Sequence, residues 1–203
     1  MDFETLDKIA RKNMLSRRSH AERETGFIYY HGQRVTRGVI ELRKRLTDDA
    51  SHDDLLRCAA MFHDIGKGLV NHSATGAALA RLFLSDLLKP EELDEVCRLI
   101  AAHDLRDPKS DKWDVWTKLL QDADLLDHSG SLEIWLNFHY YAHTGEPIQE
   151  SVRFYQEEYG RQVEKQRSEI NFDQSRQIFD EKIAFVHAFI QRMEVEAVGN
   201  YVL

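Results

Sequence analysis

The sequence predicts an all-α protein that folds as a single-domain helical bundle with its candidate site in the core. Apolar residues recur at helical spacing through most of the chain, and no segment alternates apolar and polar residues as a half-buried strand does. Three prolines and ten glycines are few for a β-rich protein with many turns. We predict one domain over residues 1–203, because this length supports one full core and no repeat or linker divides it.

The charge and composition exclude several functional classes. The formal charge is −8, and no run of lysine or arginine stands out, so we expect no nucleic-acid polymer as a partner. No stretch approaches the roughly 20 apolar residues of a membrane span, and the first four residues lack the start of a signal peptide. Cys58 and Cys97 lie in apolar helical patterns, which is typical of buried thiols in a reducing compartment. We expect a cytoplasmic protein.

Two helices are predicted at the start of the chain. The first covers residues 2–24, a charged segment with thin apolar periodicity that Gly26 ends. The second covers residues 28–46, where apolar residues recur at helical spacing from Val35 onward. His31 lies four residues before Val35 and therefore points inward on the same stripe. A single histidine on such a stripe is more often a core residue bonded to a backbone carbonyl than a ligand.

An apolar helix then runs into the central stretch of the chain, His63-Asp64-Ile65-Gly66-Lys67. An adjacent imidazole and carboxylate offer a nitrogen and an oxygen ligand to one metal ion. Asp64 on such a helix would cost several kcal/mol if it were buried without a partner. For an isolated His-Asp pair, the ordinary interpretation is a helix end with a capping aspartate and a satisfied histidine. The assignment therefore depends on the rest of the chain.

Three further candidates lie on inward helical faces or at helix ends. His72 stands at the entrance of the next helix, and His103 follows the inward face of the helix after that. Asp124 lies within a helix over residues 115–129, on the same face as Leu120. A carboxylate deep in an apolar helix needs a partner of opposite charge. One shared metal ion would explain why so many titratable groups point inward.

Helices are also predicted over the remainder of the chain. Residues 132–141 are rich in aromatic side chains, which we interpret as core in preference to a base-stacking platform. A strongly charged helical segment covers residues 148–168. The last helix, residues 173–196, carries apolar residues on one side and is expected to close the bundle.

The order of these motifs resembles that of the HD-domain superfamily of metal-dependent phosphohydrolases. The resemblance covers about half of the chain, from Tyr29 to Asp127, and the closing helix also looks like those that end some stand-alone members. It is carried by Tyr30-His31-Gly32-Gln33-Arg34-Val35, Ala59-Ala60-Met61-Phe62-His63-Asp64-Ile65-Gly66-Lys67, His72-Ser73-Ala74-Thr75-Gly76-Ala77, Ile100-Ala101-Ala102-His103 and Gln121-Asp122-Ala123-Asp124. The resemblance implies an HD core over about residues 28–128, with the N-terminal helix 2–24 and C-terminal helices 148–196 packed on it.

The resemblance also implies a ligand set. Four residues match the ligands shared across the superfamily: His31, His63, Asp64 and Asp124. His72 and His103 match the extra pair of two-metal members, in which Asp64 would bridge the ions. The gap from Lys67 to His72 is shorter than in many such members, and a short loop holds His72 at the second ion or turns it outward. The cofactor would be one or two ions of iron, manganese, cobalt, nickel or zinc, with magnesium as a further candidate.

The activity implied is hydrolysis of a phosphate ester or anhydride by a metal-activated water. The partner would be a small phosphorylated molecule, a nucleotide or a similar compound. Asp64 and Lys67 are the expected catalytic residues, with Lys67 at the substrate phosphate. Asp104 differs from the small polar residue found at this position in the dinucleotide-cleaving group, so that substrate is not carried over.

Two arginines near His31 are candidates to join Lys67 at the phosphate. Arg34 and Arg37 flank the inward face of their helix. The alternative interpretation is a solvated helix face or a salt bridge to Asp122 or Asp127. Asp127 and the neighbouring His128 are candidates to orient a metal ligand.

Two other functions remain open from the sequence. Some six-ligand members of the superfamily are di-iron oxygenases that resemble inositol oxygenase in their ligands. A non-catalytic nucleotide-binding module is the third alternative, although none of the four shared ligands is missing. The natural substrate, the metal, the number of ions and the oligomeric state are not determined by the sequence.

Overall fold

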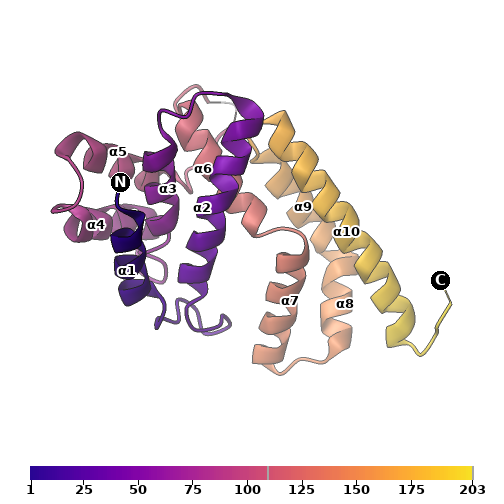
Figure 1. Cartoon of the computed structure of the whole chain (residues 1–203). Helices are drawn as coiled ribbons and strands as arrows, with labels where there is room; N and C mark the ends of the chain where they lie inside the picture. The colour runs from indigo at the N-terminus through magenta and orange to yellow at the C-terminus, as the bar shows by residue number, and fades with distance from the viewer. Residues whose placement is uncertain (109, 203) are drawn as a thin grey trace.

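The structure is a computed structural model that describes residues 1–108 and 110–202. This part of the chain contains ten α-helices and no strand, which confirms the predicted all-α class (Figure 1). The helices are α1 (Phe3–Met14), α2 (Phe27–Leu46), α3 (Asp53–Phe62), α4 (His72–Leu84), α5 (Pro90–Ala102), α6 (Val115–Asp127), α7 (Ser131–Thr144), α8 (Ile148–Glu157), α9 (Tyr159–Ser168) and α10 (Asp173–Ala197).

Helices α2 and α3 form the central pair of the fold. Helix α2 packs on α3 and α6, α3 also packs on α5, and α4 packs on α5. The predicted stripe of α2 is buried, and α3 buries six of its ten residues, including Ala59 and Ala60. At Gly32 the two helices are so close that a Cβ atom would lie 2.8 Å from the carbonyl oxygen of Met61. This close approach brings the ends of α2 and α3 that carry His31 and His63 together.

Helices α7 to α10 lie side by side on the other side of the fold (Figure 1). Helix α10 contacts α7, α8 and α9 and also reaches α2 and α6, through a buried stripe that includes Phe179 and Val186. Asp122 of α6 accepts hydrogen bonds from the backbone N–H groups of Asn171 and Phe172, at 2.9 and 3.1 Å. Asp122 therefore ties the start of α10 to α6 and is not a salt-bridge partner of Arg34.

Three predicted segments differ from the structure. The N-terminal helix ends at Met14 and not near residue 24, because the Arg17 guanidinium instead donates to the carbonyl oxygens of Ile65 and Lys67. The segment 148–168 is two helices separated at Glu158, whose backbone φ is −116°.

The aromatic stretch of α7 is only partly core. Ile134 and Leu136 are buried, whereas Trp135 and Tyr140 are 54% and 47% exposed. The helix turns one face to the bundle and another outward, so the prediction that the aromatic residues form core was wrong for these two.

Two smaller expectations concern the cysteines and membranes. Cys58 and Cys97 are both free and buried, as the sequence predicts. Over the described residues, none of the helices has both the length and the apolar character needed to span a bilayer.

Candidate metal centre

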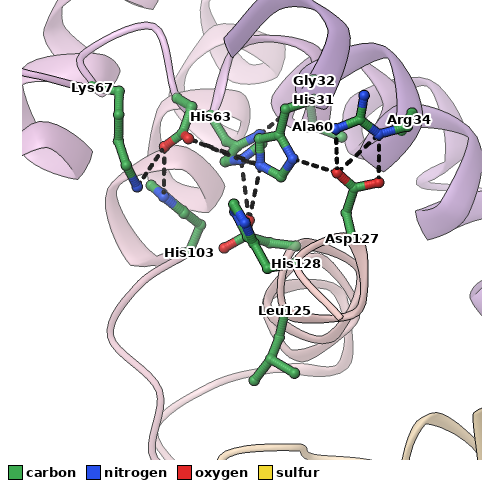
Figure 2. Close-up of polar contacts among 12 residues, drawn as sticks. His31, Gly32, Arg34, Ala60, His63, Lys67, His103, Leu125, Asp127 and His128 are labelled. Atoms are coloured by element: carbon green, nitrogen blue, oxygen red, sulfur yellow. Dashed lines mark hydrogen bonds and ion pairs between the residues drawn. The ribbon is translucent and has the colours of Figure 1, made fainter. Parts of the chain in front are cut away.

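The structure brings all six predicted ligands into one buried cluster where five helices meet. They are His31 in α2, His63 and Asp64 in the turn after α3, His72 at the first position of α4, His103 just after α5, and Asp124 in α6. Three overlapping groups of three of these residues, and a fourth group that includes His128, have ligand atoms within 4.8 Å of one another. Figure 2 shows His31, His63 and His103 pointing toward a common centre.

One end of the cluster contains the four residues that match the shared ligands. The Nε2 atoms of His31 and His63 are 3.0 Å apart. Oδ1 of Asp124 lies 3.1 Å from the first and 3.5 Å from the second of these nitrogen atoms. Oδ2 of Asp64 lies 3.9 and 4.0 Å from the same two atoms. Two imidazoles and two carboxylates therefore surround one point.

The other end of the cluster is built on the second oxygen of Asp64. Oδ1 of Asp64 lies 3.6 Å from Nε2 of His72 and 3.6 Å from Nε2 of His103. These two nitrogen atoms are 3.3 Å apart. Asp64 thus presents one oxygen to each end, which is the arrangement a bridging carboxylate requires. The structure turns His72 toward the cluster and not outward.

The hydrogen bonds on the far side of the rings show that the cluster fits a metal ion. The Nδ1–H groups of His63 and His103 donate to the carbonyl oxygens of Ala60 and Ile100, both at 2.7 Å. Nδ1 of His31 donates in the same way to a carboxylate. In the neutral tautomer each Nε2 then carries a lone pair and faces carboxylate oxygens, which are also acceptors. A cation at the centre is what such a set of converging acceptors requires.

Asp64 provides a second test of the fit. Its side chain is almost completely buried, and both oxygens lack a hydrogen-bond donor among the residues that the structure describes. Burial alone would raise the pKa of this carboxyl, but its interactions with His63, His103 and Lys67 hold it well below its usual range. Lys67 balances part of this buried charge from 3.4 Å, and a metal ion coordinated by the two oxygens would balance the rest.

The pKa of His31 also indicates that the surroundings of this ring favour a positive charge. Burial would lower the pKa of His31, but its hydrogen bonds to Asp124 and Asp127 outweigh this effect and raise it to about 9. In the absence of a metal ion, the surrounding carboxylates therefore favour a proton on His31. A metal ion would supply the same positive charge.

The glycines of the central motif explain how the short connection delivers His72. A Cβ atom on Gly66 would lie 2.2 Å from the carbonyl oxygen of His72 and 2.6 Å from the backbone nitrogen of Gly76. A Cβ atom on Gly76 would lie 3.1 Å from the carbonyl oxygen of His63. The turn after α3 and the first turns of α4 therefore touch backbone to backbone, and His72 starts its helix beside Asp64.

The predicted phosphate-binding residues are placed differently from one another. Nζ of Lys67 lies 3.4 Å from Oδ1 of Asp64, at the open side of the cluster. Arg34 is held behind His31, where its Nε and Nη2 donate to Asp127. Its alternative interpretation as a salt bridge to Asp127 is therefore confirmed. Arg37 is exposed and lines a different hollow, with Phe3, so the structure does not bring it to the cluster.

Arg106 and Asp104 lie at the opening of the cluster. Neither was predicted from the sequence as a site residue. Arg106 forms an ion pair with Asp124, and its Nε is buried with no hydrogen-bond partner in the described part of the chain. Oδ2 of Asp104 lies 3.6 Å from Nε2 of His72. Both residues closely follow His103 at the end of α5, and this position was the only sequence signal for them.

His128 occupies an edge of the cluster. Its Nε2 lies 3.7 Å from Oδ1 of Asp124, and His31, Asp124 and His128 form one of the four candidate metal-binding groups. The His128 ring also lies 4.5 Å, centroid to centroid, from that of His31. Its side chain is 30% exposed, so it connects the buried cluster with the space outside (Figure 2).

The fold and the site define an all-α protein with a buried His and Asp cluster suited to metal ions. The profile of the HD domain family matches residues 28–132, and the chain therefore belongs to this family. A comparison with curated proteins finds no match.

Several solved structures share the fold over nearly the whole chain. An HD-superfamily hydrolase from Bacillus thuringiensis is 21% identical, with a TM-score of 0.68 over 98% of this chain and 100% of that one. A predicted HD-superfamily hydrolase from an uncultured Thermotogales bacterium is 22% identical, with a TM-score of 0.65 over 96% and 92% of the two chains. Bacillus subtilis YpgQ in complex with ADP is 19% identical, with a TM-score of 0.65 over 96% and 98%.

Proposed function

We propose that the protein is a metal-dependent phosphohydrolase that acts on a phosphate ester or anhydride of a nucleotide or a similar small molecule. The observation that carries this proposal is the convergence of the Nε2 atoms of His31, His63 and His103 on Asp64 and Asp124, with two cationic side chains at the opening. Membership of a family whose solved members include hydrolases supports it.

The residues divide into two groups for holding metal. His31, His63, Asp64 and Asp124 would hold the first ion; His72 and His103 would hold a second ion that shares Asp64. A bound divalent transition ion lowers the pKa of water to about 7 and neutralises charge on phosphoryl oxygens. Asp64 and Asp124 would hold such an ion in place, and the Nδ1 hydrogen bonds would keep the imidazoles in the tautomer that ligation needs.

Lys67 and Arg106 are the cations that would bind the substrate phosphate. Lys67 is 29% exposed and reaches the cluster from its open side. Arg106 combines an ion pair to Asp124 with a buried Nε that no described residue satisfies, so its guanidinium has donors available for an oxyanion. Both side chains would stabilise the charge that develops on the transferring phosphoryl group. A nucleotide substrate is supported by the complex of the structural neighbour YpgQ with ADP.

A di-iron oxygenase is the second candidate function. The observation that favours it is that His72 and His103 both face Asp64, which completes a six-residue set able to hold two ions. Imidazole and carboxylate ligands suit iron as well as manganese, cobalt, nickel or zinc. The two functions therefore differ in the chemistry observed and not in the ligand set.

The test combines metal content with two assays on protein purified without added metal. We expect one or two transition-metal ions per chain and metal-dependent phosphate release from a panel of nucleotides and p-nitrophenyl phosphate. Lys67→Ala and Arg106→Ala should each lower kcat/KM by about tenfold or more, whereas the exposed, remote Arg37→Ala serves as a matched control and should retain activity. Dioxygen uptake by the ferrous protein without phosphate release would overturn the hydrolase and establish the oxygenase.

A further inference from the structure

A cavity of about 610 Å³ opens beside the cluster, between the end of α6 and helices α7 to α9. This volume lies within the range of roughly 300–1,000 Å³ found for small-molecule sites. His128 is the residue that the cavity shares with the cluster, because it lines the cavity and lies 3.7 Å from Asp124. His128 therefore stands between the cluster and this space.

The charges that line the cavity do not suit the phosphate end of a substrate. Two carboxylates, Glu133 and Glu158, face a single cation, Arg23. Arg23 is also occupied, because its Nη1 donates to the carbonyl oxygen of Leu136 and its guanidinium lies over the Phe27 ring. A polyphosphate chain would find no available cation among these lining residues, so the cavity suits an uncharged part of the substrate.

The lining instead offers hydrogen bonds and aromatic faces. Asn137 accepts a hydrogen bond from Ser151 through Oδ1, which leaves its NH₂ group as a donor, and Gln162 and Gln166 add two further amides. Three aromatic side chains also line the cavity: Tyr140, Tyr141 and Phe154. Amides that can donate and accept, combined with aromatic faces, are the features that recognise a nucleobase by its edges and by stacking.

Glu133 gives an independent indication that a ligand belongs in this cavity. Its side chain is more than nine-tenths buried, and Oε1 accepts a hydrogen bond from Tyr155. Oε2 is buried and has no partner within the described ranges 1–108 and 110–202. The Tyr159 hydroxyl interacts with Glu133 and is likewise buried without a hydrogen-bond partner in the part of the chain that the structure describes, and a hydroxyl or amino group of a ligand would complete the hydrogen bonds of this pair.

We propose that this cavity, lined by Asn137, Gln162, Tyr140 and Glu133, is the nucleoside subsite of the substrate, with His128 marking the passage to the phosphate. The inference rests on the proposed hydrolase function and specifies its substrate as a nucleoside phosphate. Apart from Arg23 and His128, the lining comes from beyond residue 132, where the match to the HD family profile ends. The helices beyond the profile match would therefore select the substrate.

The test compares ligands that differ only in the nucleoside. Isothermal titration of the manganese-loaded full chain would measure the α,β-methylene analogues of ADP, GDP, CDP and UDP against methylenediphosphonate. At least one analogue should bind tenfold or more tightly than methylenediphosphonate. Two variants test the lining: Gln162→Ala and Asn137→Asp, of which the second keeps the acceptor for Ser151. Each should reduce the affinity advantage of the analogue over methylenediphosphonate by at least fivefold. The affinity for methylenediphosphonate itself should stay unchanged. Gln156→Ala, an exposed glutamine of α8, is the matched control and should bind like wild type.

Two results would overturn the subsite. The first is that none of the four analogues binds more tightly than methylenediphosphonate. The second is that the analogue keeps its higher affinity in both variants while the melting temperatures of these variants match that of wild type. Turnover of p-nitrophenyl phosphate separates this outcome from failure of the function. If the ester is hydrolysed without a nucleoside advantage, the hydrolase stands and the subsite fails. If the nucleoside advantage appears without any hydrolysis, the subsite stands and the hydrolase fails.

Discussion

Nδ1 of His31 lies 2.7 Å from Oδ2 of Asp127, and the same carboxylate receives the guanidinium of Arg34 from its other side. The two residues of this pair are 96 positions apart and join α2 to α6. Asp127 therefore fixes which nitrogen of His31 carries the proton and how the ring faces the cluster, while Arg34 fixes Asp127. The geometry of one candidate ligand depends on two residues that do not face the centre.

Asp127→Asn should weaken metal binding while leaving every candidate ligand in place. The amide carries no charge to hold the His31 ring, and loss of such an outer partner lowers metal affinity by about 10–100-fold. Titration with manganese, followed by calorimetry, measures the effect. Asp86→Asn, at an exposed aspartate after α4, is the control and should bind manganese like wild type. Equal affinity in Asp127→Asn would show that the hydrogen bond to His31 has no part in metal binding.

Asp64→Asn should separate stability from metal binding. In the metal-free protein this change removes a buried charge that His63 and Lys67 favour in the folded state, so the melting temperature should fall. Added manganese should raise the melting temperature of wild type by mass action and leave Asp64→Asn unmoved. Differential scanning calorimetry with and without the ion measures both effects. A metal-free variant that melts at or above the wild-type temperature would contradict this account of Asp64.

Gly66→Ala should destabilise the fold strongly. The new Cβ would lie 2.2 Å from the carbonyl oxygen of His72, and two backbone segments would have to separate to accommodate it. We expect a loss of about 1–3 kcal/mol or more in unfolding free energy, measured by urea denaturation. Gly38→Ala in the interior of α2 is the matched control, because its Cβ meets no atom within 4 Å. That change should stabilise the protein by about 0.5–1 kcal/mol, and similar values for the two variants would argue against the close approach.

Glu133 should make stability fall as the pH rises. Burial raises the pKa of Glu133 to about 7 from an ordinary 4.5, so the folded state retains a proton that the unfolded chain loses. The stabilising contribution is complete below pH 4.5 and is lost as the pH rises through 7, a change on the order of 3 kcal/mol. Urea denaturation between pH 4.5 and 8 measures the free energy of unfolding. The value for Glu133→Gln relative to that of wild type should increase as the pH rises to about 7. Glu157→Gln, at an exposed position of α8, should follow wild type at each pH.

The sequence predicts the helices and the inward direction of three histidines from local spacing, and the resemblance to the HD-domain superfamily adds the rest of the six-residue cluster. His31 lies on an apolar stripe, and His63 and His103 end apolar faces, so their inward direction follows from helical periodicity. Arg34 was ambiguous because its partner is 93 residues away in the chain. The end of α1 at Met14 likewise depends on hydrogen bonds from Arg17 to a turn about 50 residues further along.

The remaining site residues lie at or after the ends of α5 and α6, where helical periodicity no longer predicts the direction of a side chain. Asp127 is the last residue of α6, and His128 has already left helical geometry, with φ and ψ of −87° and 6°. The two neighbours therefore point to different places, one behind His31 and the other toward the cavity. Arg106 lies in an irregular segment, and only the folded structure brings it to Asp124.

The contact between Gly66 and Gly76 gives a rule for finding this architecture in other sequences. The two backbones touch, so a Cβ atom has no room at Gly66 and only a tight fit at Gly76, and the two glycines stand ten positions apart with His72 between them. In a distant relative with an equally short connection, glycine should recur at this interval even where the surrounding residues have changed. A longer connection releases the constraint, so the glycine interval distinguishes short-looped members from those with an insertion.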